Sequence, residues 1–200
     1  MYVRSMSGND LQAAVTALRA AFEAVAACDV DLLTRPDLVA ALDDLETLWC
    51  RLPTMSHRLL ARLQSEATPQ QMGAKSWKEV LMVRWRISGT EAPRQALTGP
   101  SLPPLLPATA TAQSLGLING EHVEVIRKAV DKLRGWVDTA TREQFEVTLV
   151  RTAVGVGPKE LKDAADLTLF LLDQDGPEPD DTERARKRGV TKHKQRDDGM

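Results

Sequence analysis

Apolar residues return at alternating steps of four and three along the first third of the chain. The first such series follows Asn9, which stands three residues before Gln12 in the spacing of a helix-capping box. These apolar positions share one face of a helix, so they predict an amphipathic helix that begins at Asn9. The preceding residues 1–8 have no such pattern, and we expect them to be disordered. The series consists of Leu11, Val15, Leu18, Phe22 and Val25.

A second series with the same steps begins after Pro36, a residue that suits the first turn of a helix. Pro53 should disturb this helix, because it has no N–H to donate to the carbonyl of Trp49. The apolar positions nevertheless stay in phase across it. We therefore predict one helix over 36–67 with a kink near Pro53; two separate helices are the alternative. The series consists of Leu38, Leu42, Leu45, Trp49, Leu52, Leu59 and Leu63.

Both series have the heptad-like spacing of helices that pack side by side. We expect the two helices to form an antiparallel hairpin. Their stripes then either close an internal core of a bundle, the interpretation we adopt, or extend into a seam between two copies.

Turn and capping residues divide the rest of the chain into shorter helices. Residues 68–73 have the composition of a turn, and residues 98–107 contain four of the eleven prolines. We expect this Pro-rich stretch to be an extended strap that buries Leu102, Leu105 and Leu106; a flexible linker or a ligand for an aromatic groove are the alternatives. Further helices are predicted over 76–87, 107–115, from Asn119 through Leu133, 139–154 and 158–173.

The predicted fold class is therefore all-α, an irregular bundle of six to seven helices over residues 9–173. Beyond it the composition changes abruptly. Residues 173–183 hold six acids and no base, and residues 184–196 hold seven bases and no acid. Blocks of like charge rarely pack into a core, so we expect 174–200 to be a disordered tail.

The composition indicates the cellular environment of the protein but says little about its activity. The chain has 42% apolar and 27% charged residues and a formal net charge of −2, which predicts no global attraction to nucleic acid or membrane. No stretch is long and apolar enough for a membrane span, and the N-terminus does not resemble a signal peptide. Two cysteines, Cys28 and Cys50, are expected to be free thiols in a reducing compartment. We expect a cytoplasmic protein.

The residues that could carry out chemistry are scattered. A nuclease site of the HNH type needs histidines close together around a divalent cation. His57, His122 and His193 are far apart, and we expect the first two to be surface or capping residues. Residues 173–176 lack the later ligands of a calcium loop, and GVGPKE at 155–160 lacks the ending of a phosphate-binding loop. We expect no catalytic residue, no metal and no cofactor.

Several segments together resemble a known family. They are GAKSW at 73–77, RIS at 86–88, ALTGPSLPPLLPATATA at 96–112, GLINGEHVEVIRKAV at 116–130, GWVDTATREQ at 135–144 and LDQDGPEPDDTERARKRGVTKHKQRDDGM at 172–200. The chain is similar to the actinobacterial 13E12 repeat family, a domain of unknown function (family 222). The resemblance implies that this chain corresponds to the helical N-terminal part of the family's proteins. Those proteins usually end in an HNH nuclease motif and are associated with mobile elements.

The sequence departs from that family in two places. Family members usually continue through a strand-rich segment to the nuclease, whereas this sequence ends at Met200. We therefore expect the tail to be disordered or paired with another copy. The family also has a longer helix after RIS, so whatever that helix does is in doubt here.

Two clusters of basic residues are candidate DNA contacts. Residues 76–97 have the helix, turn and second helix of a helix-turn-helix, although Pro93 lies inside the second helix; an ordinary helical corner is the alternative. Its cations are Lys75, Lys78, Arg84, Arg86 and Arg94. The tail supplies Arg184, Arg186, Lys187, Arg188, Lys192, Lys194 and Arg196, unless the neighbouring acids neutralise them.

The sequence and the resemblance together lead to two hypotheses. The first is a non-catalytic DNA-associated domain that positions or oligomerises an attached nuclease. The second is a helical module that dimerises or binds protein and does not bind DNA. The expected partners are accordingly double-stranded DNA and a second copy of the chain, with no membrane and no small-molecule substrate.

Overall fold

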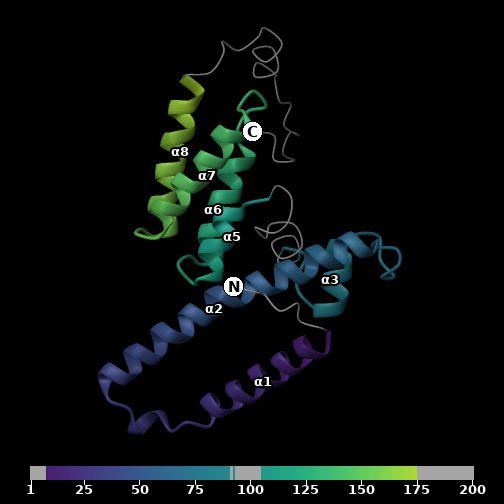
Figure 1. Ribbon diagram of the computed structural model, residues 1–200, viewed down its shortest axis with the longest axis vertical. Helices are drawn as coiled ribbons and strands as arrows, with labels where there is room; N and C mark the ends of the chain where they lie inside the picture. The colour runs from purple at the N-terminus through teal and green to yellow at the C-terminus, as the bar shows by residue number, and fades with distance from the viewer. Residues whose placement is uncertain (1–7, 91, 93–104, 175–200) are drawn as a thin grey trace, which may run out of the picture. The chain divides into compact units, whose positions relative to one another are not determined.

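The computed structural model describes residues 8–90, 92 and 105–174, and within these ranges it contains seven α-helices, one short 3-10 helix and no strand. The all-α prediction is confirmed (Figure 1). The predictions for residues 1–7, 93–104 and 175–200 lie outside the described residues. The chain divides into two units, residues 1–48 and 49–200, and each is treated separately below.

The first unit contains α1 (Gly8–Ala26), the 3-10 helix η1 (Val30–Leu32) and the beginning of α2 (Arg35–Glu66). Asp29 caps η1 by accepting a hydrogen bond of 3.1 Å from the backbone N–H of Asp31. Thr34 then donates to Asp37 Oδ2 from its backbone N–H (3.1 Å) and from its hydroxyl (2.6 Å), which fixes the turn before α2. These local bonds stabilise the connection between the end of α1 at Ala26 and the start of α2 at Arg35.

Helix α2 is continuous for 32 residues with Pro53 inside it, so the single-helix prediction is confirmed and the two-helix alternative is wrong. The prediction of an internal core between the first two stripes is also wrong. No described residue between 8 and 48 is buried, and Phe22 and Leu42 are 67% and 65% exposed. The periodic spacing correctly indicates that these side chains share one face of each helix. It cannot indicate whether another part of the chain packs against that face.

The second unit begins with the packed part of α2, where Cys50, Thr54 and Leu60 are buried. A turn over 68–73 follows as predicted, and Gly73 closes it at φ 78°, a left-handed conformation in which a side chain would be strained. Helix α3 (Trp77–Trp85) starts at Ser76, whose hydroxyl accepts a hydrogen bond of 3.2 Å from the N–H of Glu79. It ends two residues earlier than predicted.

Only the end of the Pro-rich stretch belongs to the described residues. Leu106 is 2% exposed and packs in the core as expected, whereas Leu105 is 69% exposed, so its predicted burial is wrong. Strap residues alternate sides in extended backbone, and neighbouring leucines therefore cannot both face the bundle. Leu102 lies outside the described residues.

The remaining helices form the main core: α5 (Pro107–Ser114), α6 (Gly120–Asp131), α7 (Thr139–Ala153) and α8 (Pro158–Gln174). Their predicted positions are confirmed to within two residues. Asn119 caps α6 in a capping box with His122, and Asp138 caps α7. Helix α6 packs against the other three helices. The predicted stripe of α6 is buried, as is the facing side of α7 and α8: Val123, Ile126, Val130, Leu133, Phe145, Leu149, Ala153, Leu161 and Ala165.

Candidate functional site

The predicted helix-turn-helix region forms a small cluster of its own. Leu60 near the end of α2, Leu81 on α3 and Ala92 are buried together, at 4%, 2% and 0% exposure. Trp77 and Ile87 pack against the edge of this cluster. Ala92 has helical backbone conformation and follows a turn at 89–90. The first helix and the turn of the predicted motif are therefore present, and apart from Ala92 the predicted second helix lies outside the described residues.

The end of α3 has the conformation that such a turn requires. Arg86 takes up a left-handed backbone conformation at φ 55° directly after Trp85. A residue in this conformation ends a helix because it cannot continue the right-handed hydrogen-bond ladder. The following turn approaches α3 closely: a Cβ added to Gly89 would lie 3.5 Å from Cε of Lys78. Lys78 is thereby held beside the turn.

Four of the predicted DNA contacts are on the surface of this corner. Lys75, Lys78, Arg84 and Arg86 are all exposed, and the described residues 73–90 contain Glu79 as their one acid. The cations do not share one face, because Lys78 and Arg84 lie about 120° apart around the axis of α3. The positive charge therefore surrounds the corner instead of forming a single stripe. Arg94 and the seven cations of 184–196 lie outside the described residues.

His57 and His122 are expected to be surface or capping residues, and the expectation is confirmed for His122 alone. His122 is 8% exposed, although its predicted capping role is confirmed. Its Nε2–H donates to the carbonyl of Val156 at 3.0 Å, because a carbonyl oxygen can only accept. The other ring nitrogen, Nδ1, lies 2.7 Å from Oδ1 of Asn119 and 3.4 Å from the backbone N of Asn119. His122 thus ties the start of α6 to the loop between α7 and α8.

His57 is half-buried on α2, and its Nδ1 has no hydrogen-bond partner among the described residues. Burial lowers the pKa of His57 below its ordinary value, and the positive charge of Arg127 lowers it further. Both effects favour the neutral ring. The expectation of a surface histidine fails here because the helical period alone could not show which turns of α2 are covered.

A buried polar cluster that sequence reasoning missed lies within the second unit. Glu146 on α7 is 3% exposed and accepts from the backbone N–H of Thr109 at 2.7 Å and from its hydroxyl at 2.8 Å. Helix α5 has no side-chain cap of its own, so a carboxylate from α7 occupies the N-terminal position that a cap would fill. No local signal in the sequence could reveal a cap supplied from 37 residues away.

The second unit also buries a cation and an amide that has no partner among the described residues. Arg127 on α6 is 3% exposed; burial lowers its pKa, while the charges of Asp131 and Glu146 raise it. Gln113 on α5 is fully buried, and neither its amide N nor its amide O has a partner among the described residues. The hydroxyl of Thr54 is buried in the same way. The contacts of Glu146 with Thr109 and its charge interaction with Arg127 connect α5, α6 and α7 through polar groups.

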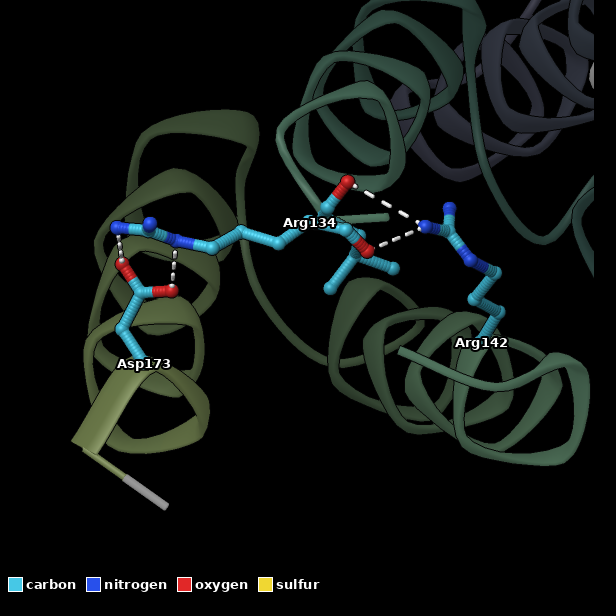
Figure 2. A network of polar contacts seen from close by, with 4 residues as sticks. Arg134, Arg142 and Asp173 are labelled. Carbon is cyan, nitrogen blue, oxygen red and sulfur yellow. Dashed lines mark hydrogen bonds and ion pairs between the residues drawn. The ribbon is translucent and has the colours of Figure 1, made fainter. Parts of the chain in front are cut away.

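A cleft of about 310 Å³ lies between the end of α6 and α8, with Trp136 and Phe170 in its lining. Its rim charges are paired: Lys132 contacts Asp166 at 3.0 Å, and Arg134 contacts Asp173 at 2.8 Å. Figure 2 shows Arg134 extended toward Asp173, while its backbone carbonyl faces Arg142. Arg142 donates to that carbonyl at 2.7 Å and to the carbonyl of Leu133 at 3.4 Å. This network fixes the loop between α6 and α7.

Two absences can be stated for the residues described. Within 8–90, 92 and 105–174, no three His, Cys, Asp or Glu side chains gather as metal ligands would. No helix in those ranges combines the length and apolarity needed to cross a membrane.

The fold makes this an all-helical protein, and comparison with known sequences gives the particular family. The sequence model described as Domain of unknown function (DUF222) matches residues 39–200, so the chain belongs to that family. Uncharacterized protein Rv1128c of Mycobacterium tuberculosis (strain ATCC 25618 / H37Rv) is 38% identical over 202 residues, which cover 96% of this chain and 44% of that protein. Uncharacterized protein Mb1179c of Mycobacterium bovis (strain ATCC BAA-935 / AF2122/97) is 35% identical over 209 residues, covering 99% and 46%.

The chain thus spans about half the length of the curated relatives it matches. No solved structure matches it.

Proposed function

We propose that this chain is a non-catalytic domain that associates with double-stranded DNA through the corner formed by α3, the turn at 89–90 and Ala92. The observation that carries the proposal is the buried contact of Leu60, Leu81 and Ala92, which holds Ala92 against α2 and α3 after the turn at 89–90. Exposed cations surround that corner. In such folds the second helix can enter a major groove while the flanking cations bind phosphates.

The role of this association is to place a longer protein on DNA. The relatives are about twice as long as the region matched here, and the resemblance to the 13E12 repeat family implies an HNH nuclease in the part that follows. A helical domain that binds phosphates without reading bases would hold the attached part near the duplex. In this proposal Lys75, Lys78, Arg84 and Arg86 contribute phosphate contacts, and the basic residues between 184 and 196 add a second set.

The salt dependence of duplex binding tests this proposal directly. Each phosphate contact releases counterions, so the logarithm of the affinity should fall linearly with the logarithm of the salt concentration. A Lys78→Ala/Arg84→Ala double variant should lower the slope by about 2. A matched double variant, Arg151→Ala/Lys159→Ala, removes two exposed cations from α7 and α8 and should leave the slope unchanged. Equal slopes for both variants would contradict the proposed interface.

A chain that ends at residue 182 separates the contribution of the tail from that of the corner. If the corner binds DNA, the shortened chain keeps a slope of its own, and Lys78→Ala/Arg84→Ala still lowers it. Incubation of the full chain with duplex DNA and magnesium should give no cleavage, because the proposed role is non-catalytic. Cleavage by the purified chain would overturn that part of the proposal.

A second candidate is a helical module that binds protein and not DNA. The observation that favours it is the exposed apolar face of α1 and of the beginning of α2. Duplex binding that is absent even at low salt would favour this candidate over the first.

A further inference from the structure

One face of α3 combines an exposed aromatic ring with positive charge. Lys78, Met82 and Trp85 stand at steps of four and three, so they share one face of the helix. All three are exposed, Met82 at 36% and Trp85 at 44%. Arg86 follows Trp85 directly and is exposed as well. The indole ring therefore has one cation two helical turns before it and another directly after it.

Packing of the corner does not account for the ring of Trp85. Trp77, at the other end of α3, packs against the buried cluster of the corner, and Trp85 does not belong to that cluster. The turn after α3 lies against the first two residues of the exposed face. A Cβ added to Gly89 would lie 3.5 Å from Cε of Lys78 and 3.6 Å from Cε of Met82. This turn holds Lys78 in place, while Trp85 remains open to solvent.

The charges around this face favour an anionic partner. Residues 73–90 contain four bases against the single acid Glu79. Glu79 Oε2 accepts a hydrogen bond of 2.8 Å from the backbone N–H of Lys75, so this carboxylate is engaged at the start of the helix. A partner that is anionic and also has flat apolar faces matches both properties of the surface. A nucleic-acid strand has both, because its phosphates are charged and its bases stack on aromatic side chains.

We infer that this face binds an unpaired DNA strand, with a base stacked on the indole of Trp85 and phosphates at Lys78 and Arg86. In a duplex the faces of the bases are closed by their neighbours, so only an unpaired base can stack on the ring. Lys78 and Trp85 are separated by about 10 Å along the helix, which corresponds to about three nucleotides of a stacked strand. The inference rests on the DNA role proposed above and adds the form of DNA that the corner binds.

Fluorescence anisotropy with a labelled oligothymidine and with a blunt duplex of the same length tests this inference. Trp85→Ala removes the stacking surface and should weaken binding of the oligothymidine by about 5- to 150-fold, with little change for the duplex. Trp85→Phe should keep most of the affinity, because a phenyl ring also stacks on bases. Trp49→Ala removes a tryptophan that is 71% exposed on α2 and should change neither affinity.

Intrinsic fluorescence gives a second readout that a structural role of Trp85 would not produce. A base stacked on an indole ring quenches its emission, so oligothymidine should lower the tryptophan fluorescence of the wild-type chain. Trp85→Phe should lose this change while it still binds, and Trp49→Phe should retain it. Circular dichroism of Trp85→Ala should show the wild-type helix content. Unchanged oligothymidine affinity in Trp85→Ala overturns the inference, as does an equal loss of duplex affinity or quenching that persists in Trp85→Phe.

Failure of this inference and failure of the proposed duplex role are distinguishable. Trp85→Ala leaves the cations of the corner intact, whereas Lys78→Ala/Arg84→Ala tests the salt slope of duplex binding and leaves Trp85 intact. A chain that binds the duplex with the expected slope, but binds oligothymidine equally well with and without Trp85, contradicts the inference alone. Oligothymidine binding that depends on Trp85, without any duplex binding, contradicts the duplex role alone. A chain that binds neither probe contradicts both.

Discussion

Helices α1 and α6 carry apolar stripes of the same period but differ completely in burial. The apolar stripe of α6 is buried: Ile126 is 0% exposed and Val123 is 3% exposed. The stripe of α1 buries no residue. Helix α6 packs against α5, α7 and α8, and short connections join these helices along the chain. An apolar period therefore determines which face a helix must bury, and the arrangement of its neighbours determines whether the same chain can bury it.

The two regions also differ in how polar groups are used. In the second unit a buried carboxylate caps a helix from outside and lies near a buried guanidinium. Within residues 8–48, side-chain hydrogen bonds such as that from Thr34 to Asp37 join residues close in the sequence. A hydrogen bond is electrostatically stronger where packing has excluded water. The second unit is thus held by both kinds of contact within one chain.

Removal of one leucine from each region should give the largest contrast. Leu149→Ala empties a position that is 1% exposed and should lower the free energy of unfolding by roughly 2–5 kcal/mol. Leu42→Ala should change it by less than about 0.5 kcal/mol when the protein is dilute enough to be a single chain. Urea denaturation measures both. Equal losses would show that the α2 stripe is packed within one chain after all.

Loss of the carboxylate that caps α5 should have the next largest effect. Glu146→Gln keeps the shape of the side chain but weakens two charge-assisted hydrogen bonds from Thr109, so we expect a loss of about 1–3 kcal/mol. The matched change Glu143→Gln lies on the exposed side of α7 and should have little effect. If both variants unfold at the same urea concentration, the buried cluster does not stabilise the second unit.

The half-buried His57 should make stability depend on pH where α2 joins the second unit. Burial lowers the pKa of folded His57 below 6.5, so the unfolded chain binds the proton more readily. The contribution of His57 to the free energy of unfolding should be constant above pH 6.5. It should fall as the pH drops from 6.5 toward the pKa of His57 in the folded protein. His57→Gln should flatten this slope, whereas Arg58→Gln, an exposed neighbour, should not. An unchanged slope in His57→Gln would place the titrating group elsewhere.

The ion pair at the end of α8 should contribute least. Asp173→Asn removes the paired contacts with Arg134 at 2.8 and 3.1 Å on a partly exposed surface, so we expect a loss of about 1 kcal/mol or less. The loss should shrink as salt is added, because exposed charges are screened. Asp163→Asn on the same helix serves as the control. A loss that salt does not change would mean that the pair acts through packing of the loop after α6 instead.

Much of this protein could be predicted from local sequence. The all-α class, the continuity of α2 through Pro53, the cap at Asn119 and the stripe of α6 depend on neighbours within a few residues, and the structure confirms them. The exposed cations at 75, 78, 84 and 86 could also be anticipated, because lysine and arginine side chains are mostly exposed in folded proteins. The contacts proposed for them still await measurement.

Other properties depended on which helices meet in three dimensions. Residues 109 and 146 lie far apart in the sequence, so nothing local indicates that a glutamate caps α5. The same holds for the burial of His57 and for the bare stripes of α1 and α2, since a helical period is identical whether its face is covered or not. Local sequence determines backbone conformation because hydrogen bonds and caps act over about one turn. Burial is decided by tertiary structure, because it requires a second surface to exclude the water.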